Sequence, residues 1–156
     1  MAWSNSKIFV ATLEDILENT TAVDLNSDTF KAALYDNDIT PDQTVASANT
    51  AYNAGQWAAS GNEVSESGQW AAGGVSLSGV SSSFSSNVYT FDATDTASGS
   101  AADLASVYGV LVYDDTISTP VADQGLCYNY LGGSNSVVNG TFTVVWSASG
   151  IMAYTL

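Results

Sequence analysis

The sequence predicts a mainly β fold, an antiparallel β-sandwich or barrel-like domain with one short N-terminal helix. Short apolar runs recur along the chain, separated by turn residues roughly every 8 to 12 positions. The run 141–146 alternates apolar and polar residues, which places Phe142, Val144 and Trp146 on one face. The run 107–113 has no charged residue and is apolar on both faces, as is typical of a strand in the middle of a sheet.

We take this central run as the strand around which the others are arranged. Strict alternation puts Val107, Leu111 and Tyr113 on one face. Tyr108, Val110 and Val112 then lie on the other face. The acidic pair at 114–115 ends the strand.

Residues 8–18 predict the single helix, because their apolar side chains fall on one helical face. Thr12 followed by Asp15 resembles a capping box, so the helix is expected to begin near Thr12 and to run for about two turns. The preceding residues 1–7 are interpreted as an anchoring arm that carries Trp3.

The remaining elements follow from the same patterns within a single domain of residues 1–156. Further strands are expected at 29–35, 74–80, 88–92, 126–131 and 150–156. Turns are expected at the serine run 81–86, at Gly132-Gly133 and, as a tight hairpin, at 138–141, and a turn of helix is expected at 101–105.

The charge balance restricts the classes of partner. The chain has 2 basic and 16 acidic residues and no histidine, for a formal net charge of -14. Nucleic acid and anionic membranes are excluded as partners, because both require cationic side chains. The single Cys127 excludes an intrachain disulfide, and the start of the chain lacks the features of a secretion signal. We therefore expect synthesis and folding in a host cytoplasm.

No pattern of residues predicts an enzyme. Without histidine there is no Ser-His or Cys-His pair, and zinc coordination lacks its usual ligands. Calcium is the alternative that the acidic turns leave open, with Asp36, Asp38, Asp114 and Asp115 as candidate ligands. Ordinary turn capping by these aspartates is the preferred interpretation, so no cofactor is expected.

A short repeat brings two tryptophans to attention. Residues 55–61 recur with small changes as 68–74, and each copy carries the motif Gly-Gln-Trp-Ala-Ala. Trp57 and Trp70 are expected in the core, because large aromatic side chains are mostly buried. The alternative is an exposed aromatic platform that binds a sugar or a protein partner.

Three phrases of the sequence resemble a family of small structural proteins of tailed bacteriophages. They are Asp28-Thr29-Phe30-Lys31-Ala32-Ala33-Leu34-Tyr35, Gly109-Val110-Leu111-Val112-Tyr113-Asp114-Asp115 and Asn139-Gly140-Thr141-Phe142-Thr143-Val144-Val145-Trp146. The resemblance implies a virion component, an accessory decoration protein that stabilises the capsid shell. An acidic protein is repelled by packaged DNA, so the outer head surface is the expected location.

The expected partner is the major capsid protein, and the chain itself is expected to form a homo-oligomer, a trimer being one form. The alternative is a tail-associated or host-glycan-binding adhesion module that uses Trp57 or Trp70. Trp3, Trp57 and Trp70 are therefore the candidate partner-binding residues.

Overall fold

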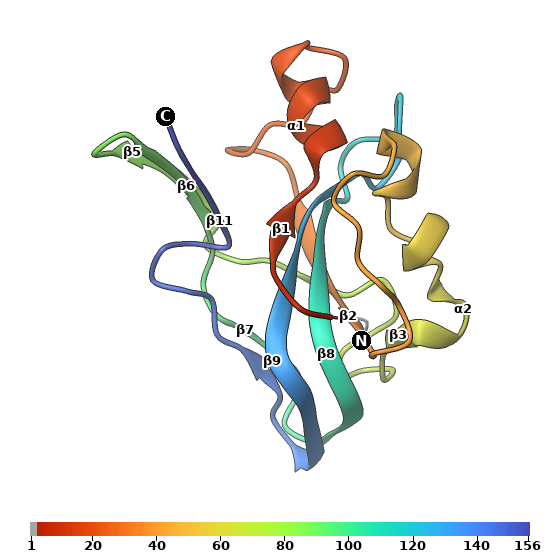
Figure 1. The fold of residues 1–156 in the computed structure, drawn as a ribbon. Helices are drawn as coiled ribbons and strands as arrows, with labels where there is room; N and C mark the ends of the chain where they lie inside the picture. Colours follow the sequence, from red (N-terminus) through yellow and green to blue (C-terminus); the bar gives the residue numbers. More distant parts are fainter. Residues whose placement is uncertain (1–2) are drawn as a thin grey trace.

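The computed structural model describes residues 3–156 and confirms a mainly β fold with antiparallel sheets (Figure 1). The largest sheet has the order β1-β9-β8-β2-β3, and β4 pairs with β2 beside this path. Its strands are β1 (Lys7–Ile8), β2 (Phe30–Tyr35), β3 (Glu63–Val64), β4 (Val75–Ser76), β8 (Ala102–Asp114) and β9 (Gly125–Gly140).

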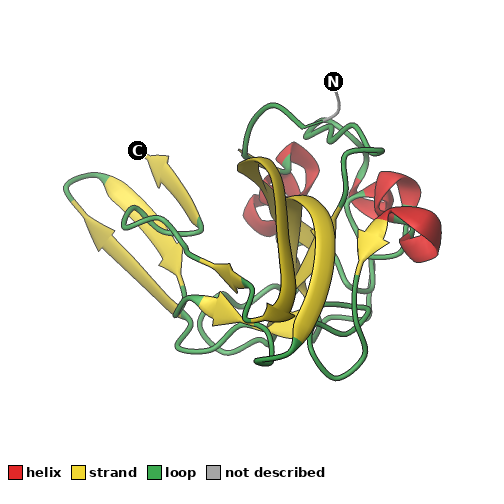
Figure 2. Cartoon of the chain, turned by 90° about the horizontal axis from the view of Figure 1, so that it is seen from below, coloured by secondary structure: helices red, strands yellow, loops and turns green. Residues whose placement is uncertain are grey.

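Two smaller sheets complete the fold. One has the order β11-β6-β5 and consists of β5 (Ser81–Ser85), β6 (Val88–Asp92) and β11 (Met152–Thr155). The other pairs β7 (Thr96–Ala97) with β10 (Thr143–Val144). Figure 2 shows the three-stranded sheet diverging from the large sheet, so the strands do not close into a barrel.

The helical elements are short. They are α1 (Val10–Leu17), α2 (Ala59–Asn62) and two 3-10 turns, η1 (Ser47–Asn49) and η2 (Gly55–Trp57). No helix in the described residues 3–156 is long and apolar enough to cross a membrane. The predicted capping box is wrong: α1 begins at Val10, and the buried Thr12 hydroxyl donates to the carbonyl of Gly125 at 2.5 Å. Thr12 therefore fastens the helix to β9 instead of capping it.

The central strand lies where the sequence placed it, between β2 and β9. The side chains of this strand do not alternate strictly between its two faces, because the pairing with β9 shifts register between Val107 and Gly109. A bulge reverses the side to which the following residues point. Val107 consequently packs with Val110 and Val112, whereas the predicted faces separated them.

Two apolar clusters cover the two faces of the large sheet. The first fills the space toward the small sheets and includes Phe30, Leu34 and Phe91. The predicted inward residues of the run 141–146 belong to it, with Phe142, Val144 and Trp146 at 8%, 2% and 9% exposure. The second cluster lies on the opposite face and consists of Trp3, Phe9, Ala33, Tyr35, Ile39, Trp57, Leu111, Tyr113 and Tyr128.

Several predicted turns are strands in the structure. The serine run forms β5, and its hairpin turn is Ser86-Asn87, where both residues have positive φ (51° and 65°) as a type I′ turn requires. Residues 102–105 begin β8 instead of forming a helical turn. β9 continues past Gly132-Gly133 and through Asn139, so neither position makes the predicted break or hairpin.

Candidate docking groove

The three tryptophans proposed to bind a partner are all in the core. Trp3, Trp57 and Trp70 are 1%, 0% and 0% exposed. The Trp3 and Trp57 rings lie 5.9 Å apart, and the Trp70 indole N–H donates to the carbonyl of Ala32 at 3.0 Å. The core location expected for Trp57 and Trp70 is therefore confirmed, and the alternative of an exposed aromatic platform is wrong, because packing removes both rings from contact with solvent or a ligand.

The N-terminal segment is also part of the fold from residue 3 onward. The Trp3 indole N–H donates to the carbonyl of Asp36 at 2.6 Å, and its ring covers Gly109, where a Cβ would lie 2.3 Å from the ring. Lys7 and Ile8 then pair with β9. The predicted anchoring arm is thus docked on its own domain over 3–7, while residues 1–2 lie outside the described part.

The acidic residues proposed as calcium ligands lie in two separate places. Asp36 Oδ1 accepts a hydrogen bond from the backbone N–H of Asp38 at 2.9 Å, which is the local capping expected of a turn. Asp114 and Asp115 follow each other at the end of β8. Within residues 3–156 the structure brings together no three His, Cys, Asp or Glu side chains that could hold a metal ion.

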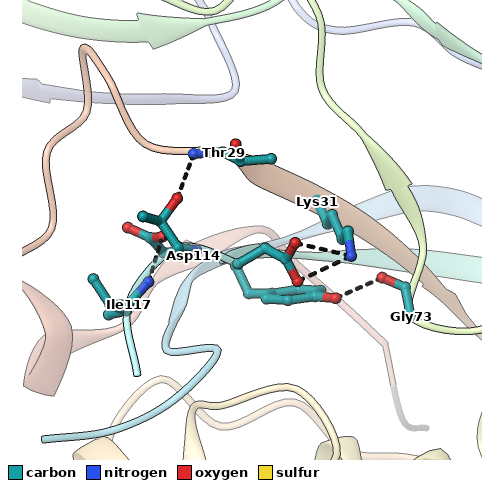
Figure 3. A network of polar contacts seen from close by, with 8 residues as sticks. Thr29, Lys31, Gly73, Asp114 and Ile117 are labelled. Atoms are coloured by element: carbon teal, nitrogen blue, oxygen red, sulfur yellow. Dashed lines mark hydrogen bonds and ion pairs between the residues drawn. The ribbon is translucent and has the colours of Figure 1, made fainter. Parts of the chain in front are cut away.

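Asp114 is the centre of a buried polar network that joins the end of β8 to the start of β2 (Figure 3). Its side chain is 0% exposed, and Oδ1 accepts from the N–H groups of Thr116 at 2.8 Å and Ile117 at 3.3 Å. Burial raises the pKa of this carboxyl to about 7, and the facing Asp28 carboxyl contributes to the rise. The second carboxyl oxygen of Asp114, Oδ2, is buried and has no hydrogen-bond partner among the described residues.

The neighbouring contacts in Figure 3 are structural as well. Lys31 Nζ lies 2.9 Å from both carboxylate oxygens of Asp115, and Tyr113 donates its hydroxyl to the carbonyl of Gly73 at 2.6 Å. Burial raises the pKa of Tyr113, and the nearby Asp115 adds to the effect. These bonds hold β2, β8 and the loop before β4 together.

The surface feature best suited to binding is a groove between α1, β1 and the three-stranded sheet. Its lower part, of about 420 Å³, lies between the ends of β1 and β11 and is lined by Ile8, Cys127, Ile151 and Met152 among others. Its upper part, of about 530 Å³, lies between the loop 19–26 and the sheet and is lined by Ile16, Val23, Leu25, Tyr89 and Tyr154 among others.

A narrow apolar gap connects the two parts. It shares Ile8 and Met152 with the lower part, and it shares Ile16 and Tyr154 with the upper part. The groove therefore follows the inner face of β11 along its length. The two parts of the groove thus meet at apolar side chains. Tyr89 and Tyr154 stack within the upper part, with ring centroids 5.1 Å apart.

Both sides of the lower groove are edges of sheets. Within the described residues 3–156, β1 pairs only with β9 and β11 pairs only with β6, so each has one side without a strand partner. A free edge presents backbone N–H and C=O groups that can add a further strand. An extended segment of another polypeptide in this groove would contact apolar side chains below it and backbone groups beside it.

The sequence indicated only part of this site. Alternation placed Tyr89 and Phe91 on one face of a strand, and that is where they lie, opposite Tyr154 and Met152 of β11. Nothing in the pattern indicated that Phe91 would be covered while Tyr89 stays half-exposed. That difference depends on how far the two sheets diverge, which is a property of the assembled fold.

Comparison with known proteins adds no relative to these observations. No family model, no curated protein and no solved structure matches the chain. The groove is consequently interpreted from its own chemistry.

Proposed function

We propose that this chain is a non-enzymatic structural protein of a virus particle, an accessory protein that decorates and stabilises the outer surface of a capsid shell. The mainly β fold and the low charged fraction of 12% suit a rigid domain within an assembly. The net charge of -14 favours a location away from packaged DNA. The resemblance of its strand phrases to phage structural proteins supports the same class.

The observation that carries the proposal is the groove with two free strand edges. We assign to it an extended segment of the major capsid protein, bound as an added strand between β1 and β11. The apolar lining would take alternate side chains of that segment. The net charge of -14 attracts a basic segment to the chain at long range, whereas Lys7 is the charged side chain that lines the lower groove itself.

The test is co-sedimentation of the purified protein with assembled shells of the parent particle, using two variants of Ala153. This residue is exposed on β11, and the strand register directs its backbone N–H away from β6 toward the groove. Ala153→Pro removes that N–H and is expected to reduce shell binding by at least about tenfold, whereas Ala153→Val keeps it and should bind as the wild type does. Circular dichroism confirms that both variants are folded.

Equal binding by the proline and valine variants would refute docking at this edge. Immunogold electron microscopy of the parent particle tests the location independently. Regular label on the head is expected, and a particle without label on the head would refute the decoration function itself.

A tail-associated or glycan-binding adhesion function is the second candidate, and one observation favours it. The stacked rings of Tyr89 and Tyr154 are half-exposed beside Asn19, Asp24 and Asn26 in the upper groove. Aromatic faces beside amide and carboxylate groups are suited to sugar rings. Label on the tail, together with loss of cell binding in Tyr154→Ala, would favour this candidate over shell decoration.

A further inference from the structure

A second free edge lies on the other side of the three-stranded sheet. β5 is the outer strand of the order β11-β6-β5, and all five of its residues, Ser81–Ser85, are exposed. The β5–β6 hairpin projects from the body of the molecule with β5 outermost (Figures 1 and 2). Natural edge strands are usually protected by charges, proline or a covering segment. β5 has no charged residue and no proline, and among residues 3–156 it pairs only with β6.

The hairpin register determines which backbone groups face outward. Ser85 and Val88 flank the two-residue turn and pair directly, so alternate residues of β5 bond to β6. Ser81, Ser83 and Ser85 therefore direct their backbone groups inward. Ser82 and Phe84 direct theirs to the open edge.

The side chains of the same strand add an apolar contact at the edge. Phe84 lies opposite Tyr89 in the register, and Tyr89 lies opposite Tyr154. The three rings thus form a row across one face of the sheet. Phe84, at 60% exposure, is the outermost ring, and the described part of the chain places no strand on its outer side.

Charge indicates what covers this edge. The chain carries a net charge of -14, so two copies repel each other over most of their surfaces. The segment 80–91, which contains β5, the turn and all of β6 except Asp92, has no Asp, Glu, Lys or Arg. A basic partner would find no acidic group along this segment, whereas a second copy of this chain can approach it without bringing like charges together.

We propose that two copies of the chain associate by antiparallel pairing of β5 with β5 about a twofold axis at Ser83. In this register Ser82 of each copy lies opposite Phe84 of the other, and each such pair exchanges both backbone hydrogen bonds through the groups that face outward. The two Phe84 rings become diagonal neighbours on one face. The two three-stranded sheets become one continuous sheet with a self-complementary contact.

The contact is small, so the association is expected to be weak. One strand pair and two phenylalanine rings bury less than the roughly 1,200 Å² typical of stable complexes. Screening of the like charges by salt should strengthen the dimer. This inference concerns only contacts between copies and stands whether or not the groove binds a shell protein.

The test uses position 83, because only a residue on the twofold axis faces its own counterpart. Ser83→Lys and Ser83→Asp each place two like charges opposite each other, and each variant alone should be monomeric by sedimentation equilibrium at up to about 1 mM, where the wild type dimerises. An equimolar mixture of the two variants should recover dimers, since the introduced lysine of one copy then meets the introduced aspartate of the other. Thr155→Lys, at the opposite edge of the same sheet, is the matched control and should dimerise as the wild type does.

Circular dichroism and thermal unfolding establish that the variants are folded. Three results would overturn the proposal: a wild type that stays monomeric over this range, a mixture that stays monomeric, or equal loss of dimer in Thr155→Lys. Recovery in the mixture with an unaffected control would establish both the edge and the register.

Discussion

Replacing Trp3 with alanine tests the finding that the N-terminal segment is part of the core. Its side chain is 1% exposed, its ring packs against Trp57 and Tyr128, each with a centroid distance of 5.9 Å, and its indole N–H donates to the carbonyl of Asp36. Truncating a buried aromatic residue to alanine costs about 3 to 5 kcal/mol. The lost hydrogen bond adds about 1 kcal/mol.

The free energy of unfolding of Trp3→Ala is therefore expected to fall by about 4 to 6 kcal/mol, which lowers the midpoint of thermal unfolding by roughly 8 to 24 °C for a domain of this size. Urea unfolding followed by far-ultraviolet circular dichroism measures it, since the loss of one of 4 tryptophans alters the fluorescence signal. Trp3→Phe keeps most of the packing but not the N–H donor and should lose about 1 to 2 kcal/mol.

Ser4→Ala is the matched control, because Ser4 is exposed next to Trp3 and its substitution should change stability by less than about 0.5 kcal/mol. If Trp3→Ala were no less stable than Ser4→Ala, the ring would not be in the core. The N-terminal residues would then be free to act as an anchoring arm, as the sequence suggested.

Three further predictions concern single positions. The pKa of Asp114 is higher in the folded protein than in the unfolded chain, so the folded state binds more protons and its stability should fall as pH rises from about 4 to 7. Urea titrations at pH 5 and pH 8 should show a loss of unfolding free energy on the order of 2 kcal/mol in the wild type. Asp114→Asn should remove most of this loss. Gly74→Ala should destabilise the fold by more than about 3 kcal/mol in urea unfolding, because the φ of Gly74 is +83° and a Cβ there would lie 2.1 Å from the carbonyl oxygen of Ala32. Gly68→Ala, at a residue with φ +78° and no atom within 4 Å of the added Cβ, should cost only about 1 kcal/mol. Equal costs for the two variants would contradict the close approach at Gly74. Asn87→Gly should raise the midpoint of thermal unfolding by stabilising the hairpin by about 0.5 to 1 kcal/mol, since glycine adopts the positive φ of this turn without steric cost, and a lower midpoint would argue against the type I′ turn.

The sequence by itself determined the class of fold and its best-patterned strands. The charge-free run 107–113 required a position with apolar material on both faces, because neither set of alternate side chains tolerates water. The run 141–146 likewise specified which of its residues face inward, and Phe142, Val144 and Trp146 do so. These inferences hold because alternation along a strand is a local property of the backbone.

Other features depended on partners far away in the sequence. The bulge between Val107 and Gly109 arises from pairing with β9 and reverses which residues share a face. The serine run 81–86 has no apolar pattern, yet its first five residues form a strand, because β6 offers a complete edge and Ser86-Asn87 adopts the required turn. Propensity alone favoured a turn there, and pairing with a neighbouring strand outweighed it.

The candidate site shows the same division. The repeat made Trp57 and Trp70 prominent in the sequence, but a repeat does not determine exposure, and both rings are buried. The groove arises where α1 and β1 face a three-stranded sheet built from two segments far apart in the chain, Ser81–Asp92 and Met152–Thr155. Residue type and spacing determine which side chains prefer to leave water; only the arrangement of the sheets determines which of them, such as Tyr89 and Tyr154, remain at the surface for a partner.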